Sequence, residues 1–168
     1  VQGEKVLPGV GYLEMARAAV ENAIGEDTNG RMLELRNVLW SKPLVVNEQQ
    51  QPLHIVLYED RSDAVHYEVY SELYETKASL IHSQGSAVFK VKQPISQIDL
   101  AKLQSQMNLG SLSSERCYQI FNAMGLNYGP GHQGIEEIFQ GEGQVLAKLS
   151  LPNALQSSLG TYVLHPCL

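Results

Sequence analysis

Few cysteines, no long apolar run and no excess of basic residues mark this chain of 168 residues. Its two cysteines, Cys117 and Cys167, lie at no spacing typical of a metal site, so we expect reduced thiols and no bound metal. The sequence has neither an apolar run long enough to cross a bilayer nor a secretory signal. We therefore expect a cytoplasmic protein without a membrane span.

The charge balance is acidic, with 12 Lys and Arg against 18 Asp and Glu and a formal net charge of −6. No stripe of basic residues follows any part of the chain, which argues against binding to nucleic acid. The length fits one ordinary domain, or two small units that share a core.

A helix is predicted between the pair Pro8-Gly9 and Gly25. Proline suits a helix start, where its missing N–H costs nothing, and glycine suits the left-handed residue that follows a helix end. The apolar residues cover most of this helix, which predicts that it is wrapped by other structure. The remaining polar stripe is narrow and would let an arginine pair with an acid on either side: Glu14, Arg17 and Glu21.

The start of that helix allows two interpretations. Its free backbone N–H groups, near Gly9 and Val10, could receive a carbonyl oxygen or an anion, and Gly9 and Gly11 leave the approach open. Alternatively, the glycines only permit a tight turn before a buried helix. The residues alone favour the turn.

Four strands are expected after the helix, and in two of them, at 53–59 and 65–74, the side chains alternate between two faces. Asn37 marks an irregularity, and Gly85 marks a bulge or a close backbone approach. One helix followed by antiparallel strands predicts an α+β unit over residues 1–92, in which a curved sheet wraps the helix. The strands cover residues 32–40, 53–59, 65–74 and 80–91, with turns at 26–31, 47–52, 60–64 and 75–79.

Residues 93–113 are polar and contain Pro94 and Gly110, which predicts a linker. A second unit over residues 114–168 begins with a short helix at 115–124, capped by Ser113 or Ser114. A glycine-rich loop, a hairpin and a second loop follow. This unit reads as truncated before a central helix of its own.

Three motifs together resemble the dehydratase domains of polyketide synthases. The stretch Val1–Pro8 is similar to the family's signature of His, three residues, Gly, four residues and Pro, with Gly3 and Pro8 at the matching positions. Tyr128-Gly129-Pro130 with Gln133 resembles the family's Tyr-Gly-Pro-x-x-Gln loop. Leu164–Leu168 resembles the lead-in to the family's catalytic aspartate. The His132 variant resembles bacterial modular synthases whose acyltransferases act in trans.

The resemblance implies a double hot-dog fold with two curved antiparallel sheets, each around a central helix, the second apparently incomplete in this chain. It implies loss of water from a 3-hydroxyacyl thioester, giving a 2-enoyl thioester. The substrate would arrive on the phosphopantetheine arm of an acyl carrier protein, with no cofactor of the domain's own. Neighbouring synthase domains and a homodimer are the other partners it implies.

The resemblance places the acid and the base outside the chain. The histidine would lie two residues before Val1 and the aspartate two residues after Leu168. The chain as written therefore lacks both groups, and the parent protein is the expected dehydratase. Two alternatives stay open: an enoyl isomerase or cyclising relative, and a double hot-dog that only binds acyl chains or holds an assembly together.

The remaining motif residues take supporting roles under this resemblance. The Gly9 and Val10 N–H groups would polarise the thioester carbonyl, and Tyr128 would line the site. Gly129 and Pro130 would shape the loop, and Gln133 would hold it through backbone hydrogen bonds. His165 and Pro166 would position the second helix, while His132 would only pack. The strand histidines are expected at the surface: His54, His66 and His82.

Overall fold

The computed structural model describes residues 1–25, 31–47, 51–59, 64–73, 76, 78–91, 94 and 97–168. The predicted turns at 26–31, 47–52, 60–64 and 75–79 lie wholly or partly outside these residues. The chain forms two compact units, and each is described by itself. One unit comprises Glu4–Gln93, and the other comprises Val1–Gly3 together with Pro94–Leu168.

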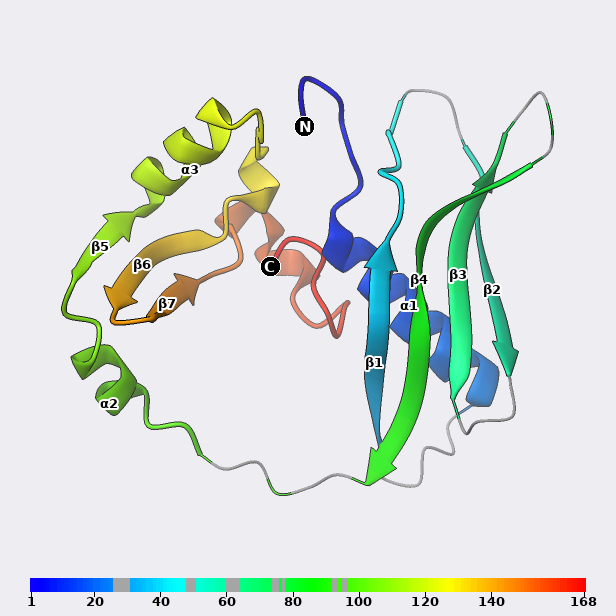
Figure 1. The fold of residues 1–168 in the computed structure, drawn as a ribbon, viewed down its shortest axis with the longest axis horizontal. Helices are drawn as coiled ribbons and strands as arrows, with labels where there is room; N and C mark the ends of the chain where they lie inside the picture. Colours follow the sequence, from blue (N-terminus) through cyan, green and yellow to red (C-terminus); the bar gives the residue numbers. More distant parts are fainter. Residues whose placement is uncertain are drawn as a thin grey trace. The chain divides into compact units, whose positions relative to one another are not determined.

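The Glu4–Gln93 unit is an antiparallel sheet with one long helix lying along a face of it (Figure 1). The strand order is β1-β4-β3-β2, so the first and last strands in space are β1 and β2. No described helix of the chain is both long and apolar enough to span a membrane. The elements are α1 (Gly9–Ile24), β1 (Arg31–Trp40), β2 (Leu53–Glu59), β3 (Val65–Glu72) and β4 (Ser79–Val91).

Helix α1 begins and ends where the sequence predicts. Pro8 is its N-cap, in an extended conformation with φ −62° and ψ 146°. Gly25 follows the last helical residue with φ 81°, and its N–H donates to the Glu21 carbonyl at 3.0 Å. A left-handed φ of this kind favours glycine, which explains why the helix stops at this point.

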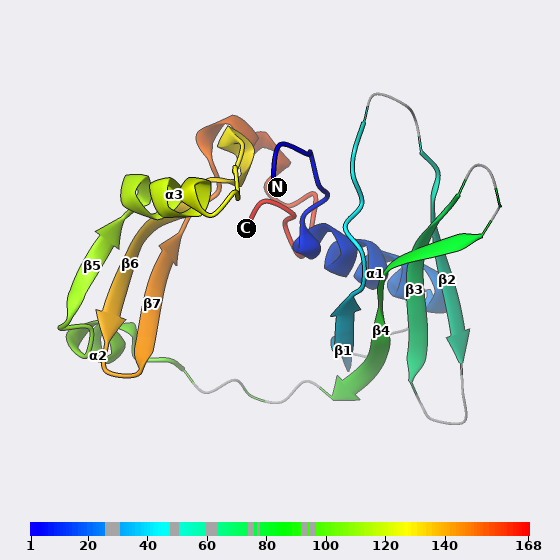
Figure 2. The same ribbon diagram turned by 45° about the horizontal axis from the view of Figure 1, so that its top comes forward.

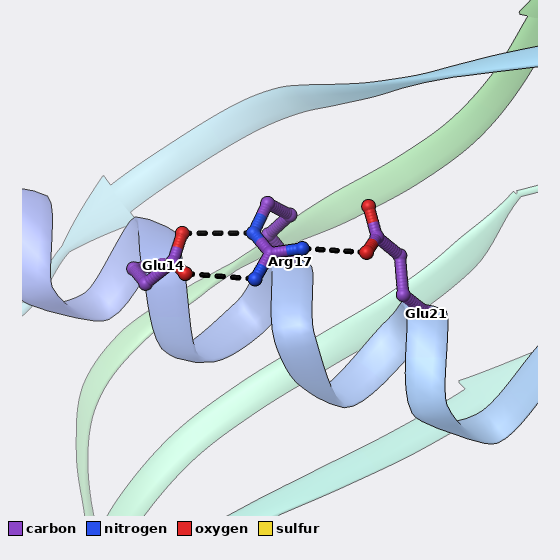
Figure 3. A network of polar contacts seen from close by, with 3 residues as sticks. All are labelled: Glu14, Arg17 and Glu21. Atoms are coloured by element: carbon purple, nitrogen blue, oxygen red, sulfur yellow. Dashed lines mark hydrogen bonds and ion pairs between the residues drawn. The ribbon is translucent and has the colours of Figure 1, made fainter. Parts of the chain in front are cut away.

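The predicted polar stripe on α1 is a three-residue ion-pair network (Figure 3). Arg17 donates from Nε and Nη2 to the two carboxylate oxygens of Glu14, at 2.8 and 2.7 Å, and from Nη1 to Glu21 at 2.5 Å. Glu14 is buried. The hydrogen bond to Glu14 raises the pKa of Arg17, and the bond to Glu21 raises it further, although burial acts in the opposite direction.

The core of this unit lies between α1 and the sheet. Tyr12 and Ala16 from α1 meet Tyr67 and Val69 from β3, and all four are at most 2 % exposed. The alternation predicted for β2 is confirmed, because its inward residues pack on this cluster while Val56 and Tyr58 are exposed. The half-buried residues around the cluster are Leu7, Met15, Leu35, Leu44, Leu53, Ile55 and Leu57.

Two irregularities interrupt the regular pairing of β4. Asn37 in β1 has φ 51°, and the pairing of β1 with β4 shifts register between Arg36 and Leu39, which confirms the predicted irregularity. On the other side of β4 the register shifts so that His82 has no partner residue in β3. Such a bulge re-aims the side chains beside it, and two successive residues, His82 and Ser83, are buried here.

The other unit carries a three-stranded antiparallel sheet in the order β5-β6-β7, with α3 beside β5 and β6 (Figure 2). Residues 93–113, predicted as a linker, hold α2 and β5, and β5 pairs with β6. The chain thus has the predicted α+β, hot-dog class of fold. The elements are α2 (Leu100–Ser105), β5 (Gly110–Ser113), α3 (Ser114–Ala123), β6 (Ile135–Gly141) and β7 (Gln144–Leu149), with short 3₁₀ turns at Pro130–His132 and Asn153–Ser158.

Candidate functional site

The segment before α1 is paired with the segment after β1 through an isolated β-bridge. Val6 pairs with Val45 in an antiparallel bridge. The Leu7 N–H donates to the Leu44 carbonyl at 3.0 Å, and the Val46 N–H donates to the Lys5 carbonyl at 2.7 Å. The backbone before Pro8 is therefore fixed on the segment that follows β1.

The first turn of α1 is packed against the Trp40 indole. Trp40 Nε1 donates to the Gly9 carbonyl at 3.2 Å, and a Cβ at position 9 would lie 3.1 Å from Nε1. A side chain here would make a tight contact and displace the half-exposed Trp40 ring slightly. The Gly11 N–H donates to the Pro8 carbonyl at 3.0 Å. An α-helix leaves its first N–H groups without an intrahelical acceptor. The N–H groups of Gly9 and Val10, the donors predicted from the sequence, lie in this first turn.

The predicted Tyr128 loop borders a cavity of about 900 Å³ on the other unit. The Tyr128 ring is 42 % exposed and lies 5.3 Å from Phe121 and 5.8 Å from Tyr118, centroid to centroid. Amide and hydroxyl groups dominate the wall, so the cavity suits a polar group better than an alkyl chain. Its lining residues are Ser114, Glu115, Tyr118, Gln119, Asn122, Leu126, Asn127, Tyr128 and Gln133.

The loop is closed by short-range hydrogen bonds. Pro130 opens the 3₁₀ turn, in which the His132 N–H donates to the Gly129 carbonyl at 2.8 Å. Gln133 Nε2 donates to the Tyr128 carbonyl at 2.9 Å. The glutamine therefore spans the turn from its far end and fixes the backbone under the tyrosine.

Tyr118 on α3 secures the far end of the same loop. Its hydroxyl accepts from the Ile135 N–H at 2.9 Å and lies 3.5 Å from the His132 carbonyl. Burial raises the pKa of Tyr118, the Ile135 hydrogen bond lowers it in part, and the neighbouring Cys117 and Tyr128 raise it.

The segment Leu164–Leu168 lies beside the Tyr128 loop. His132 Nε2 is 3.6 Å from Cys167 Sγ, and a Cβ at Gly134 would lie 3.2 Å from the Leu168 side chain. Burial raises the pKa of the Cys167 thiol. A thiol with a raised pKa is a poor nucleophile, so the hydrogen bond between Cys167 and His132 holds the two segments together and does not prepare the thiol for attack.

His165 organises the same segment through both of its ring nitrogens. Its Nδ1 accepts the Cys167 N–H at 3.2 Å, which leaves Nε2 as the protonated nitrogen of the neutral ring. Nε2 then donates to Ser158 Oγ at 2.9 Å, and Ser158 donates to the Leu155 carbonyl at 2.6 Å. Pro166 follows His165 within the turn that this chain of hydrogen bonds holds.

The structure thus brings the second and third motifs together in one unit, and part of the first motif joins them. The Gln2 N–H donates to the Gly125 carbonyl, at the end of α3, at 2.9 Å. Gly3 follows with φ 87°, a left-handed value that favours glycine. Pro8, Gly9 and Val10 lie in the other unit. Within the described residues, no three His, Cys, Asp or Glu side chains are placed to hold a metal ion.

Three residues with structural roles at these motifs were missed or misplaced by the sequence. The surface position predicted for His82 is wrong, because the ring is 1 % exposed. The bulge in β4 breaks the alternation on which that prediction depended. No periodic pattern in the sequence pointed to Trp40 or Tyr118. The position of Trp40, the single tryptophan, at the end of a predicted strand could have suggested a packing role.

Comparisons with known proteins agree with the three motifs. The family model described as "Polyketide synthase dehydratase domain" matches residues 1–72, and "Polyketide synthase dehydratase N-terminal domain" matches residues 98–168. Polyketide synthase PksM of Bacillus subtilis is 39 % identical over 170 residues, which cover all of this chain and 4 % of PksM. PksN of the same organism is 38 % identical over 167 residues, covering 99 % of this chain and 3 % of PksN.

Solved structures agree as well. A dehydratase domain of a trans-AT polyketide synthase from Brevibacillus brevis matches with a TM-score of 0.93 and 42 % identity, over 99 % of this chain and 59 % of that one. The dehydratase domain from the CurF module of curacin polyketide synthase matches with a TM-score of 0.90 and 26 % identity, over 100 % and 60 %.

Fold and motifs therefore define a hot-dog domain of the dehydratase class. The chain belongs to the polyketide synthase dehydratase family. It spans about three fifths of the solved dehydratase domains that it matches and a few per cent of the synthases.

Proposed function

We propose that this chain is part of a dehydratase domain that removes water from a 3-hydroxyacyl thioester and leaves a 2-enoyl thioester. The observation that carries the proposal is the start of α1. Its backbone N–H groups, at Gly9 and Val10, follow directly on a segment that matches the family's histidine signature. The 42 % identity to a solved dehydratase domain supports it.

The reaction is general acid–base chemistry. The histidine expected two residues before Val1 takes the proton from the carbon next to the thioester carbonyl. The electron pair of that C–H bond forms the C=C bond, and the C–O bond to the hydroxyl group breaks. The aspartic acid expected two residues after Leu168 gives its proton to the departing oxygen, and water leaves.

The chain's own residues contribute by binding and positioning. The Gly9 and Val10 N–H groups at the positive end of α1 stabilise negative charge as it develops on the thioester oxygen. Tyr128 lines the acid side of the site, and Gly129, Pro130 and Gln133 keep its backbone in place. His165 and Pro166 set the path of the chain toward the aspartate.

The remaining parts of the proposal concern the setting. The substrate is carried by the phosphopantetheine arm of an acyl carrier protein, and the acid–base steps call for no further cofactor. The relatives are long polyketide synthases, so neighbouring synthase domains flank the chain in its whole protein. The matched Brevibacillus brevis domain supports a synthase with trans-acting acyltransferases. A homodimer in the cytoplasm completes the proposal.

The test uses the complete dehydratase domain with its natural flanking residues. Incubation with 3-hydroxybutyryl thioester on an acyl carrier protein is expected to lower the mass of the acyl group by one water. Alanine in place of the histidine before Val1 is expected to abolish that loss. A wild-type domain that only moves a double bond in a supplied enoyl thioester would instead establish the isomerase. A domain that binds the carrier without any mass change would contradict catalysis.

A further inference from the structure

The imidazole of His82 is buried, and the proposed reaction gives it no role. The ring lies in the first unit's interior, where it stacks on Tyr12 with centroids 6.5 Å apart and an interplanar angle of 20°. Its Nδ1 lies 3.1 Å from the Lys42 carbonyl, and its Nε2 lies 2.9 Å from Ser71 Oγ. Both ring nitrogens are therefore occupied.

These contacts define which nitrogen carries the proton. A carbonyl oxygen only accepts, so Nδ1 must be the donor to Lys42. Nε2 of the neutral ring then accepts the hydroxyl proton of Ser71. The backbone of His82 takes part as well, because its carbonyl accepts the Ser41 N–H at 2.8 Å. One residue thus holds two successive residues of the segment that follows β1.

That segment is the one that fixes the start of α1. Its residues Leu44 and Val46 hydrogen-bond Leu7 and Lys5, as described above, and Trp40, just before it, donates to the Gly9 carbonyl. We infer that His82 is a positioning residue: its imidazole fixes Lys42, and through residues 40–46 it sets the backbone that leads from the histidine signature into α1. This inference rests on the proposed function for its effect on catalysis.

A bulge explains why this role falls to a residue inside a strand. The pairing of β4 with β3 shifts register between Val69 and Tyr70, which leaves His82 without a partner residue in β3, and the His82 side chain is buried there. At this bulge the imidazole lies against Tyr12 of α1 and within hydrogen-bond distance of Lys42, just after the end of β1. Ser83 is the natural control, because its side chain is equally buried and its hydroxyl neighbours the Tyr67 hydroxyl in the core.

The test compares three variants of the complete dehydratase domain: His82→Asn, His82→Gln and Ser83→Ala. An asparagine amide can occupy the place of Nδ1 and keep the bond to Lys42. A glutamine amide reaches toward Ser71 and loses that bond. The structural readout is the indole ¹H–¹⁵N signal of Trp40, identified by its loss in Trp40→Phe. The catalytic readout is kcat and KM for 3-hydroxybutyryl carrier protein.

We expect His82→Gln to shift the Trp40 signal and to lower kcat about 10- to 100-fold with little change in KM. His82→Asn and Ser83→Ala are expected to keep both readouts close to wild type. An unmoved Trp40 signal in folded His82→Gln, or equal losses in both His82 variants, would overturn the inference. If the wild type does not turn over the substrate, the proposed function fails, while the Trp40 signal still decides the role of His82.

Should His82→Gln not fold, the wild-type imidazole provides the answer. Long-range ¹H–¹⁵N spectra distinguish the two neutral tautomers. A protonated Nδ1 with an unprotonated Nε2 supports the inference. The opposite tautomer would remove the bond to Lys42 and overturn it.

Discussion

The two units of the chain bury their apolar residues to different extents. In the Glu4–Gln93 unit, Ala16, Tyr67 and Val69 are fully buried between α1 and the sheet. In the other unit, Val145 and Leu149 on β7 remain 64 % and 54 % exposed. The first sheet has a 16-residue helix along its face, whereas the 10-residue α3 lies beside β5 and β6. A sheet of this kind acquires a core only where a helix covers it.

The largest expected effect compares the same change in both units. Val69→Ala removes two methyl groups from a site that is fully buried, so the free energy of unfolding should fall by about 2 kcal/mol. Val145→Ala removes them from an exposed site and should change it by less than about 0.5 kcal/mol. Urea denaturation of the complete domain measures both. Equal losses would show that β7 is covered in the complete domain.

Glycine substitutions sharpen the same contrast. A Cβ at Gly85 would lie 2.7 Å from the Tyr67 hydroxyl and 2.9 Å from its ring, which is fully buried and has little room to move. Gly85→Ala should therefore cost about 1–3 kcal/mol through overpacking. Gly129 has φ −66° and no neighbour within 4 Å of its Cβ position, so Gly129→Ala should be neutral or stabilise by less than about 1 kcal/mol. Thermal unfolding distinguishes the two.

For the loss of a tyrosine hydroxyl, the larger destabilisation is expected in the unit that contains α3. Tyr118→Phe in the second unit removes the acceptor of the Ile135 N–H, which should cost about 1 kcal/mol and loosen the Tyr128 loop. Tyr67→Phe in the first unit removes a buried hydroxyl whose contact with the Ser83 side chain falls short of hydrogen-bond geometry, so the loss of stability should be smaller than in Tyr118→Phe. An equal loss in both variants would show that Tyr67 has a hydrogen-bond partner in solution.

The smallest expected effect is a pH dependence that both units share. Hydrogen bonds from Arg36 and then Lys90 lower the pKa of Glu34, and those from Lys148 and then Ser150 lower the pKa of Glu136. A carboxylate with a lowered folded-state pKa stabilises the fold above its ordinary value of 4.5, and the contribution disappears as the pH falls through the folded pKa. Because both pairs are exposed, the change should be slight and screened by salt. A melting temperature followed from pH 7 downward, with Glu136→Gln as control, measures it.

Periodicity and end signals predicted most of the fold. Pro8, Gly9 and Gly25 placed α1, and alternation placed β2 at its observed bounds, because both signals depend only on residues close in the sequence. The irregularity at Asn37 was equally local, since this residue type tolerates a left-handed φ.

The parts that the sequence did not reveal depend on long-range contacts. The sequence predicted a surface position for His82. Only the pairing of β4 with β3 shows the bulge at which this side chain is buried. Trp40 reaches Gly9 across 31 positions, and Tyr118 reaches Ile135 across 17. The Tyr128 and Leu164–Leu168 motifs could be found from sequence, but their adjacency required the fold.

The hydrogen bond between Gln2 and Gly125 has a consequence for the connectivity of the chain. Because Val1–Gly3 belongs with Pro94–Leu168, the Glu4–Gln93 unit is inserted into the other one, with a single peptide bond at its entry and a polar stretch at its exit. Lengthening the exit should be inexpensive, since each doubling of a loop costs only about 0.6 kcal/mol of closure entropy. One residue inserted between Gly3 and Glu4 falls directly beside the Gln2–Gly125 hydrogen bond and the left-handed Gly3, so it should reduce stability more than several residues added after Gln93.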